Sequence, residues 1–557
     1  MSVPDGRSSP GPPGADDEAR DSSAGPSNGR DTAKVELDHG APLLPQSLTT
    51  GNASAQDIRR NMATSYGASI LAILLALVAT PVILRLLGPV LYGVSVLLVS
   101  LTANLGLLDA GVSTAAVQLL SSELARANVR RAEAILATAQ AFFLATSLVA
   151  FIVILALGLT LGSLFHLSGV PLGEARIGLW LCGAALAIRL AATSSRVAVY
   201  GSGYSWRSRW LSLLSPVLLY TGEIGVVLAG GGLLGYLAVP LGLAVLQAQW
   251  IRVIARRLGL ATPLRTRPQR AILAELLRSG WRNAVISVAG TLSYQFDGSV
   301  ISAVRNAGEV TPYSLGVSVA GVTRTLATTG TAHLLPTFAH SETLGDRARQ
   351  YRYYSRAIAA GLVIAVPLVA TLVALGHPLL HLWLGAVPRD TYAVTVLAGV
   401  GLLLQLPGGQ TFVLMTGAGR NRTLVRYALP LAILNVIFSV AATFVIGPLG
   451  PVVGGLPQAA VFEFAILPVV ACRLLGARVS SYARDTLCAP AAALVGSAAV
   501  GAIIVTIGVG PPLASVPESA GITLVGWVTG AALMLRRDKD LLRKPTITLA
   551  RLRHRAR

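Results

Sequence analysis

Four ionisable side chains lie inside apolar runs that are long enough to cross a lipid bilayer: Arg189, Asp297, Arg324 and Glu463. A charge at the centre of a bilayer costs about 2.5–3.5 kcal/mol on insertion scales, so such residues usually mark a site or a pathway. An arginine offers phosphate a planar fork of donors, and a carboxylate can take up a proton or Na⁺. The sequence therefore predicts a membrane protein that handles a charged ligand or ion.

The composition is that of an integral membrane protein. Mean hydropathy is +0.65, and 13% of the 557 residues are charged, against about 25% in a soluble chain. Runs of about 20 apolar residues, the length of a spanning helix, recur from Ser65 to Leu535. We predict an all-α integral membrane fold with about 14 transmembrane helices, arranged as two pseudo-symmetric six-helix lobes plus two C-terminal helices. The first 55 residues contain no apolar signal segment and are expected to be disordered.

The basic residues behind the net charge of +20 follow the predicted membrane topology. Arginines gather in alternate connections, such as 126–131, 252–282 and 347–356, whereas the intervening connections carry few. This is the positive-inside pattern, which predicts an even number of crossings and two cytoplasmic termini. The basicity is thus an orientation signal that favours anionic membrane lipids, and no nucleic-acid partner is predicted.

The sequence contains an internal repeat. Arg60-Asn61 opens the first predicted helix and Arg282-Asn283 opens the seventh. Further on, RLLGPVLYGVSVLL (85–98) parallels VRNAGEVTPYSLGVSVA (304–320), at an offset of about 222 residues. Six helices is an even number, so the repeats should run parallel, related by an axis along the membrane normal. Two such lobes enclose a central cavity, which favours alternating access over a fixed pore.

The repeat also sets the predicted domain organisation. The segments are a disordered cytoplasmic tail (1–55), an N-terminal lobe (56–255), a basic cytoplasmic linker (256–280), a C-terminal lobe (281–474), two further helices (475–535) and a basic cytoplasmic tail (536–557).

The same motifs carry a resemblance. RLLGPVLYGVSVLL followed by LLDAGVSTAAVQLL (107–120) resembles the amino-terminal signature of bacterial polysaccharide flippases of the Wzx type. These belong to the multidrug/oligosaccharidyl-lipid/polysaccharide exporter superfamily. The second half continues the resemblance with YQFDGSVISAV (294–304), PYSLG (312–316), LHLWLG (380–385) and TGAGRNR (416–422). The resemblance covers roughly residues 61–474, and the last two helices are not common to all members.

The resemblance implies a flippase that moves a polyprenyl-pyrophosphate-linked oligosaccharide from the cytoplasmic to the outer leaflet by alternating access. The product would serve cell-surface polysaccharide biosynthesis, and the location would be the bacterial cytoplasmic (inner) membrane. Expected partners are the lipid-linked glycan, membrane lipids and, through the cytoplasmic tails, polysaccharide synthesis enzymes; no cofactor is expected. In the related lipid II flippases two added helices form a groove for the polyprenyl tail, and whether 486–509 and 520–535 do so here stays open.

The arginines are candidate ligands of the pyrophosphate and glycan. Arg324, with threonines around it, is the leading candidate, followed by Arg189, while Arg282 and Arg60 lie at predicted cytoplasmic mouths. Each has a structural alternative. Arg324 would be held by an acidic partner, Arg189 would extend to the cytoplasmic surface, and the other two would be topology anchors.

Three carboxylates, Asp297, Glu223 and Glu463, are candidates for ion coupling, because an intramembrane acid can bind and release a proton or Na⁺ as the lobes move. The alternative is a neutral acid bonded to a neighbouring helix, or an ion pair with Arg189 or Arg324.

Two other functions stay open. An ion-coupled drug or organic-cation antiporter of the same superfamily should have a cavity of carboxylates and aromatic rings, whereas two intramembrane arginines favour an anion. A membrane glycosyltransferase or polymerase should carry acidic or Arg/His motifs on a large external loop, but the longest predicted outer connections (158–174 and 508–520) are short. No Walker loop or nucleophile elbow is present, so an enzyme is not expected.

Overall fold

The computed structural model describes residues 55–109, 111–126, 128–165, 167, 170–202, 209–259, 267–294, 296–329, 334, 337–338, 341–342, 344–507 and 515–543. Within these ranges all the regular structure is helical, which confirms the predicted all-α membrane fold. Nine stretches of the described chain are helices long and apolar enough to cross a membrane. Two of these stretches contain two predicted crossings each: α1 (Ala55–Leu105) is kinked at Gly88, and the stretch Arg422–Leu475 turns at Gly447. The helices Arg209–Leu228, Arg270–Tyr294 and Val310–Thr328, where three further crossings were predicted, are not among the nine.

The helices up to residue 257 form one group, the N-group. After α1 these are η2 (Gly106–Asp109), α2 (Val112–Ala125), α3 (Val129–Leu164), α4 (Leu172–Ala191), α5 (Thr193–Gly201), α6 (Arg209–Leu228) and α7 (Gly232–Arg257). Helix α4 packs against α1, α3 and α7, and α6 packs against α1 and α7. The core between them contains fully buried Leu97, Leu98, Leu179 and Leu237.

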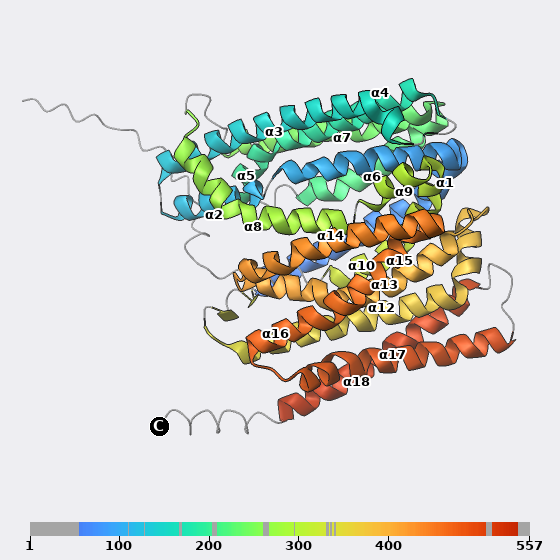
Figure 1. Ribbon diagram of the computed structural model, residues 1–557. Coiled ribbons are helices and arrows are strands. Elements are labelled where there is room, and N and C mark those ends of the chain that lie inside the picture. The colour runs from blue at the N-terminus through green and yellow to red at the C-terminus, as the bar shows by residue number, and fades with distance from the viewer. Residues whose placement is uncertain are drawn as a thin grey trace, which may run out of the picture. The chain divides into compact units, whose positions relative to one another are not determined.

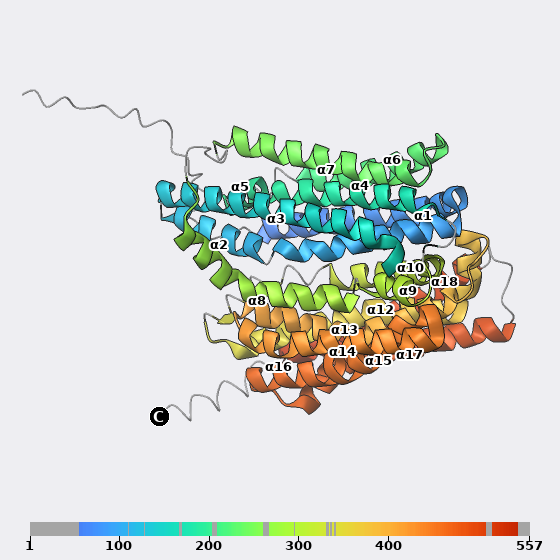
Figure 2. The same cartoon turned by 45° about the horizontal axis from the view of Figure 1, so that its top comes forward.

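The helices after residue 269 form the C-group. They are α8 (Arg270–Tyr294), α9 (Asp297–Val304), η4 (Ala307–Glu309), α10 (Val310–Thr328), α12 (Arg347–Leu384), α13 (Thr391–Gly417), α14 (Asn421–Ile446), η6 (Gly447–Leu449), α15 (Gly450–Gln458), the π-helical η7 (Ala459–Ile466), α16 (Leu467–Leu475), α17 (Val479–Ile507) and α18 (Ser515–Arg543). Helix α12 packs against α10, α13, α17 and α18. Figure 1 and Figure 2 show the N-group, blue to green, beside the yellow to red helices of the C-group.

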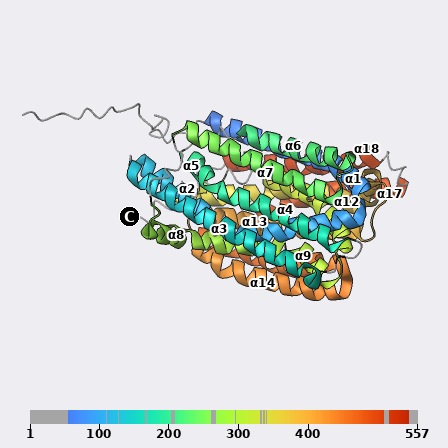
Figure 3. The ribbon, with the colours of Figure 1, turned by 90° about the horizontal axis from the view of Figure 1, so that it is seen from above.

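Helix α8 packs against both groups. Its first turns contact α2 and α3, where Ile272 and Leu276 enter the N-group core, and Arg131 of α3 forms an ion pair of 3.0 Å with Glu275. The rest of α8 packs against α14. Residues 270–280, which were predicted as linker, are helical because their apolar side chains pack against the N-group. In Figure 3, α8 and α14 lie along one edge, and α6 and α7 lie along the opposite edge.

The two groups meet closely at the end of the bundle where Gly88 lies, which we call the Gly88 end. There the Thr311 hydroxyl donates to the Pro89 carbonyl oxygen at 2.5 Å. Both residues belong to the matched segments 85–98 and 304–320, so the two copies of the repeat touch each other here. The Gly93 backbone lies so close to Ala307 and Thr311 that a Cβ on residue 93 would be only 2.6 Å from the Thr311 hydroxyl oxygen.

We expect the substitution Gly93→Val to disfavour this closed arrangement, because overpacking costs about 1–3 kcal/mol and a separation of the groups at the Gly88 end would relieve it. Spin labels at Leu86 and Leu382, which are both exposed, would report the separation by double electron–electron resonance. The population of the longer distance should rise about fivefold or more.

The matched control is Gly225→Val on α6, because a Cβ at that glycine meets nothing within 4 Å. Its distance distribution should match that of the unsubstituted protein. Unchanged distances in Gly93→Val would contradict the assignment of Gly93 as a closure contact.

Candidate functional site

A polar cavity of about 320 Å³ lies among α9, α10, α13, α14 and α15 of the C-group. Asp297 and Arg324, two of the predicted site residues, both line it. Tyr313, Gln405 and Asn435 supply further polar groups, and the remaining wall is small and apolar. We call this space the Asp297–Arg324 cavity.

The Asp297 carboxylate is held by a tyrosine. Asp297 is the first residue of α9, and its Oδ2 accepts a hydrogen bond from the Tyr313 hydroxyl of α10 at 2.5 Å. Helix α8 ends at Tyr294 and α9 begins at Asp297, so the Asp297 side chain reaches the cavity from the first turn of α9. Asp297 keeps a second carboxylate oxygen for another donor or a cation.

The Arg324 guanidinium is held by an amide. Its Nη2 donates to Gln405 Oε1 of α13 at 2.6 Å, and Gln405 belongs to the cavity wall. The neighbouring threonines that were predicted to surround it, Thr325 and Thr328, donate their hydroxyls to carbonyls within α10. A polar partner of Arg324, Gln405, therefore comes from another helix.

Asn435 adds a buried acceptor. The residue is 6% exposed on α14, and its Oδ1 has no hydrogen-bond partner among the described residues. A buried amide oxygen without a donor costs about 1–3 kcal/mol. An amide oxygen and a carboxylate in the same cavity are acceptors suited to a cation or a proton-bearing ligand.

The other two predicted carboxylates lie elsewhere. Glu223 is 5% exposed on α6, and Tyr220 of the same helix packs in one cluster with Tyr92 and Tyr236. Glu463 is 6% exposed in the π-helical η7 and packs against Gly408 of α13. Neither residue lines the Asp297–Arg324 cavity.

The predicted arginines are likewise dispersed. Arg189 lines a separate cavity among α4 to α7 of the N-group. Arg60 lies in α1 and Arg282 in α8, but their side chains are outside the described part of the structure. Of the two predicted tails, residues 1–54 and 544–557 are also outside it. Among the described residues, no group of three His, Cys, Asp or Glu side chains could hold a metal ion.

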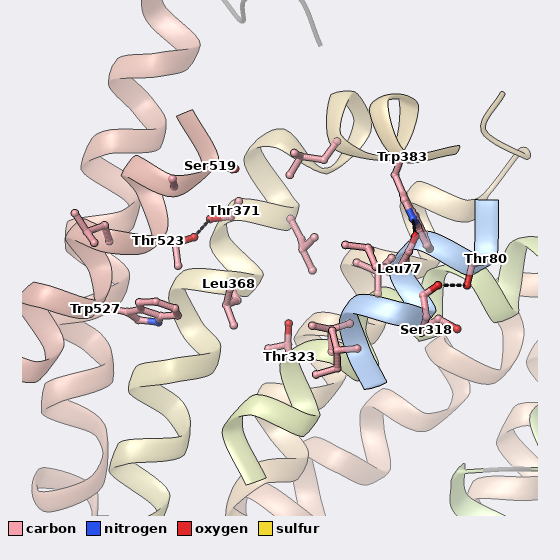
Figure 4. A pocket seen from close by; sticks show the side chains of 18 residues that line it. Leu77, Thr80, Ser318, Thr323, Leu368, Thr371, Trp383, Ser519, Thr523 and Trp527 are labelled. Carbon is pink, nitrogen blue, oxygen red and sulfur yellow. Dashed lines mark hydrogen bonds between the residues drawn. The ribbon is translucent and has the colours of Figure 1, made fainter. Parts of the chain in front are cut away.

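An apolar groove of about 510 Å³ lies between α1, α10, α12 and α18 (Figure 4). Its wall includes Leu77 of α1, Leu368 and Leu372 of α12, and Trp527 of α18. Helix α18 is tied to α12 by a 2.9 Å hydrogen bond between the Thr371 and Thr523 hydroxyls, drawn in Figure 4.

The groove and the polar cavity share helix α10. Thr323 lines the groove, and the next residue, Arg324, lines the cavity. Successive residues of an α-helix point about 100° apart, so α10 separates an apolar space from a charged one. Neither Gln405 nor the groove residues of α1 and α12 were predicted from the sequence. An amide inside the apolar helix 391–416 was the available signal for Gln405, whereas the groove depends on tertiary packing.

No family model and no curated protein matches the sequence. Solved structures do match. The lipid II flippase MurJ in an inward closed conformation has a TM-score of 0.64 at 12% identity, covering 86% of this chain and 99% of that chain. A multidrug resistance MATE family transporter of the MOP superfamily in an inward-facing conformation has a TM-score of 0.60 at 16% identity, covering 76% and 99%. An outward-facing MATE family transporter has a TM-score of 0.50 at 18% identity, covering 76% of this chain and 99% of that chain. This chain has the fold of these proteins.

The Tyr313–Asp297 bond gives a measurable coupling energy. A hydrogen bond to a charged group contributes about 1.5–3 kcal/mol and a neutral one about 0.5–1.5 kcal/mol. In a double-mutant cycle of Tyr313→Phe and Asp297→Ala, which leaves no acceptor at position 297, we expect a coupling in the upper range at neutral pH, because the short bond fits a carboxylate acceptor. Unfolding free energies in detergent would measure it.

A coupling in the lower range would indicate a protonated Asp297, and a value near zero would contradict the contact. Ser318→Ala combined with Asp297→Ala is a suitable control cycle, because the Ser318 hydroxyl donates within α10 and lines the groove.

Proposed function

We propose that the protein is a flippase that moves a polyprenyl-pyrophosphate-linked oligosaccharide from the cytoplasmic to the outer leaflet by alternating access, for cell-surface polysaccharide biosynthesis. The observation that carries the proposal is the apolar groove beside the Asp297–Arg324 cavity, with α10 between them. The likeness in fold to the lipid II flippase MurJ supports it.

Such a substrate has two halves with opposite solvation. Its polyprenyl chain is apolar. Its pyrophosphate loses its water of hydration on entering hydrocarbon, and only other polar groups can replace that water. In our proposal the groove holds the chain, with α18 as one wall. The Arg324 fork, positioned by Gln405, binds pyrophosphate oxygens once the groups move and the headgroup reaches the cavity.

Other predicted residues keep proposed roles. Arg282 and Arg60 would admit the headgroup at the cytoplasmic mouths, and Arg189 would bind phosphate in the N-group. Asp297 is the leading candidate for coupling to a proton or Na⁺, because it lines the same cavity as the unpartnered Asn435 oxygen. Glu223 and Glu463 are further candidates, since both are buried carboxylates.

The setting is part of the proposal. The described helices and their arginine-rich connections fit a multi-pass protein of the bacterial cytoplasmic membrane with both termini in the cytoplasm. The tails would then be available to polysaccharide synthesis enzymes.

A second candidate function is an ion-coupled antiporter of drugs or organic cations. A specific observation favours it: Asp297 and the Tyr313 ring meet in the cavity, and a carboxylate with an aromatic ring attracts cations. The likeness to a multidrug resistance MATE transporter supports the same candidate. A membrane glycosyltransferase or polymerase has no such support, because these structural neighbours are a transporter and a flippase.

Reconstitution into liposomes with a polyprenyl-pyrophosphate sugar tests the proposal. Enzymatic access to the headgroup from each side would measure translocation, with an organic dye cation tested in parallel under the same gradients. We expect Arg324→Ala to abolish translocation at unchanged abundance, and Leu372→Trp to reduce it at least about tenfold by filling the groove.

Two matched variants serve as controls. Arg473→Ala removes an exposed arginine outside the cavity, and Val373→Trp places the indole on the exposed face beside Leu372. Both should retain translocation. Dye movement without lipid translocation would identify the antiporter, and full activity of Arg324→Ala would overturn the cavity assignment.

Asp297→Asn should remove the dependence of translocation on an ion gradient, because the amide has no titratable proton and binds cations weakly. Translocation rates under imposed proton and Na⁺ gradients would measure this. Retained dependence would move the coupling role to Glu223 or Glu463.

A further inference from the structure

A second polar cavity, of about 280 Å³, lies among α4, α5, α6 and α7. Its polar lining consists of Arg189, Arg196, Tyr200, Ser215 and Gln247, and it shares no residue with the Asp297–Arg324 cavity. We call it the N-group pocket. It lies in the other helix group, so the proposed flippase cavity does not account for it.

The two arginines of the N-group pocket form a like-charged pair. They are seven residues apart, about two helical turns, so both side chains can reach one space. Their charges repel each other. None of the lining residues is acidic, and within the described part of the chain neither guanidinium has an ion pair or hydrogen bond. Two cations that share a pocket without a carboxylate are stabilised by binding an anion.

The opposite wall of the pocket is polar and ordered. Gln247 Nε2 donates to Ser215 Oγ at 2.9 Å, and that hydroxyl donates to the Leu211 carbonyl at 2.5 Å. The Gln247 amide therefore has a second N–H that this bond does not use. Arginine forks and an amide donor are the groups that bind phosphate oxygens.

Neighbouring tryptophans indicate the depth of the pocket in the membrane. Trp210 is 69% exposed next to the lining residue Leu211, and Trp250 is 44% exposed next to the lining residue Ile251. Exposed tryptophans concentrate where the headgroups begin. The pocket thus lies where a phosphate at the membrane surface could reach it, toward the end rich in arginine.

We propose that the N-group pocket is a separate phosphate-binding site, occupied by the phosphate of an anionic phospholipid or by a water-soluble phosphate. Arg189 was proposed above as a ligand of the transported headgroup, and here it binds a second phosphate that stays in the pocket. The inference follows from the charges and donors of α4 to α7 alone, so its failure would leave the flippase proposal unchanged.

The test uses the full chain in nanodiscs and has two arms. One arm compares phosphatidylglycerol with phosphatidylcholine and measures the phosphatidylglycerol retained per protein by native mass spectrometry. The other arm titrates inorganic pyrophosphate into phosphatidylcholine nanodiscs and follows the thermal unfolding midpoint. In at least one arm, the double variant Arg189→Gln/Arg196→Gln should lose about tenfold or more in apparent affinity.

The matched control is Arg252→Gln, because Arg252 lies on the same helix, α7, as Gln247 but lines a different cavity. It should bind as the unsubstituted protein does. If the glutamine variant does not fold, Arg189→Lys/Arg196→Lys keeps both charges without the planar fork and should lose part of the affinity.

Loss in the phosphatidylglycerol arm supports a lipid headgroup as the occupant, and loss in the pyrophosphate arm supports a soluble phosphate. Equal binding by the double variant and the unsubstituted protein in both arms would overturn the proposal. An equal loss in Arg252→Gln would also overturn it, because the effect would then reflect net charge and not the pocket.

Discussion

The close contact between equivalent backbone segments at the Gly88 end is the constraint on which the rest of the structure depends. The Thr311 hydroxyl donates to the carbonyl of Pro89, which lies in the matching segment of the repeat, and Gly93 leaves no room for a side chain. Small residues allow membrane helices to approach in this way, where no hydrophobic force drives association. Because the groups are held together here, polar cavities remain within each group and an apolar groove remains between α1 and the C-group.

Helix α10 organises the chemistry of the C-group. It carries Tyr313 and Arg324 toward the polar cavity and Val319 and Thr323 toward the groove. The charged groups are held by residues from outside their own helix turn: Asp297 by Tyr313 and Arg324 by Gln405. Such pairing lowers the cost of ionisable groups among apolar helices, since buried polar groups need their partners. A movement of α10 would change the surroundings of both spaces together.

The fold was predictable from the sequence because the signals are local: apolar length, charge alternation and a repeat with an even number of helices. The ionisable residues were predictable for the same reason, since each interrupts an apolar run. Which of these residues share a cavity was not predictable from the sequence. Arg189 and Arg324 look equivalent in sequence, yet only Arg324 lines the cavity that also contains Asp297. Gln405 and the groove arise from contacts between distant segments, and α8 starts before residue 281 because Ile272 and Leu276 pack on α2 and α3.

Helix α8 acts as a strut along one edge, since its first turns are anchored to the N-group and its remainder to α14. Because α8 is fixed to both groups, a relative motion of the groups would be smallest beside α8 and largest at the far edge. The far edge is where α1 faces α18 across the groove. If the two groups move relative to each other, the groove between α1 and α18 should therefore widen or narrow more than the contacts beside α8 do.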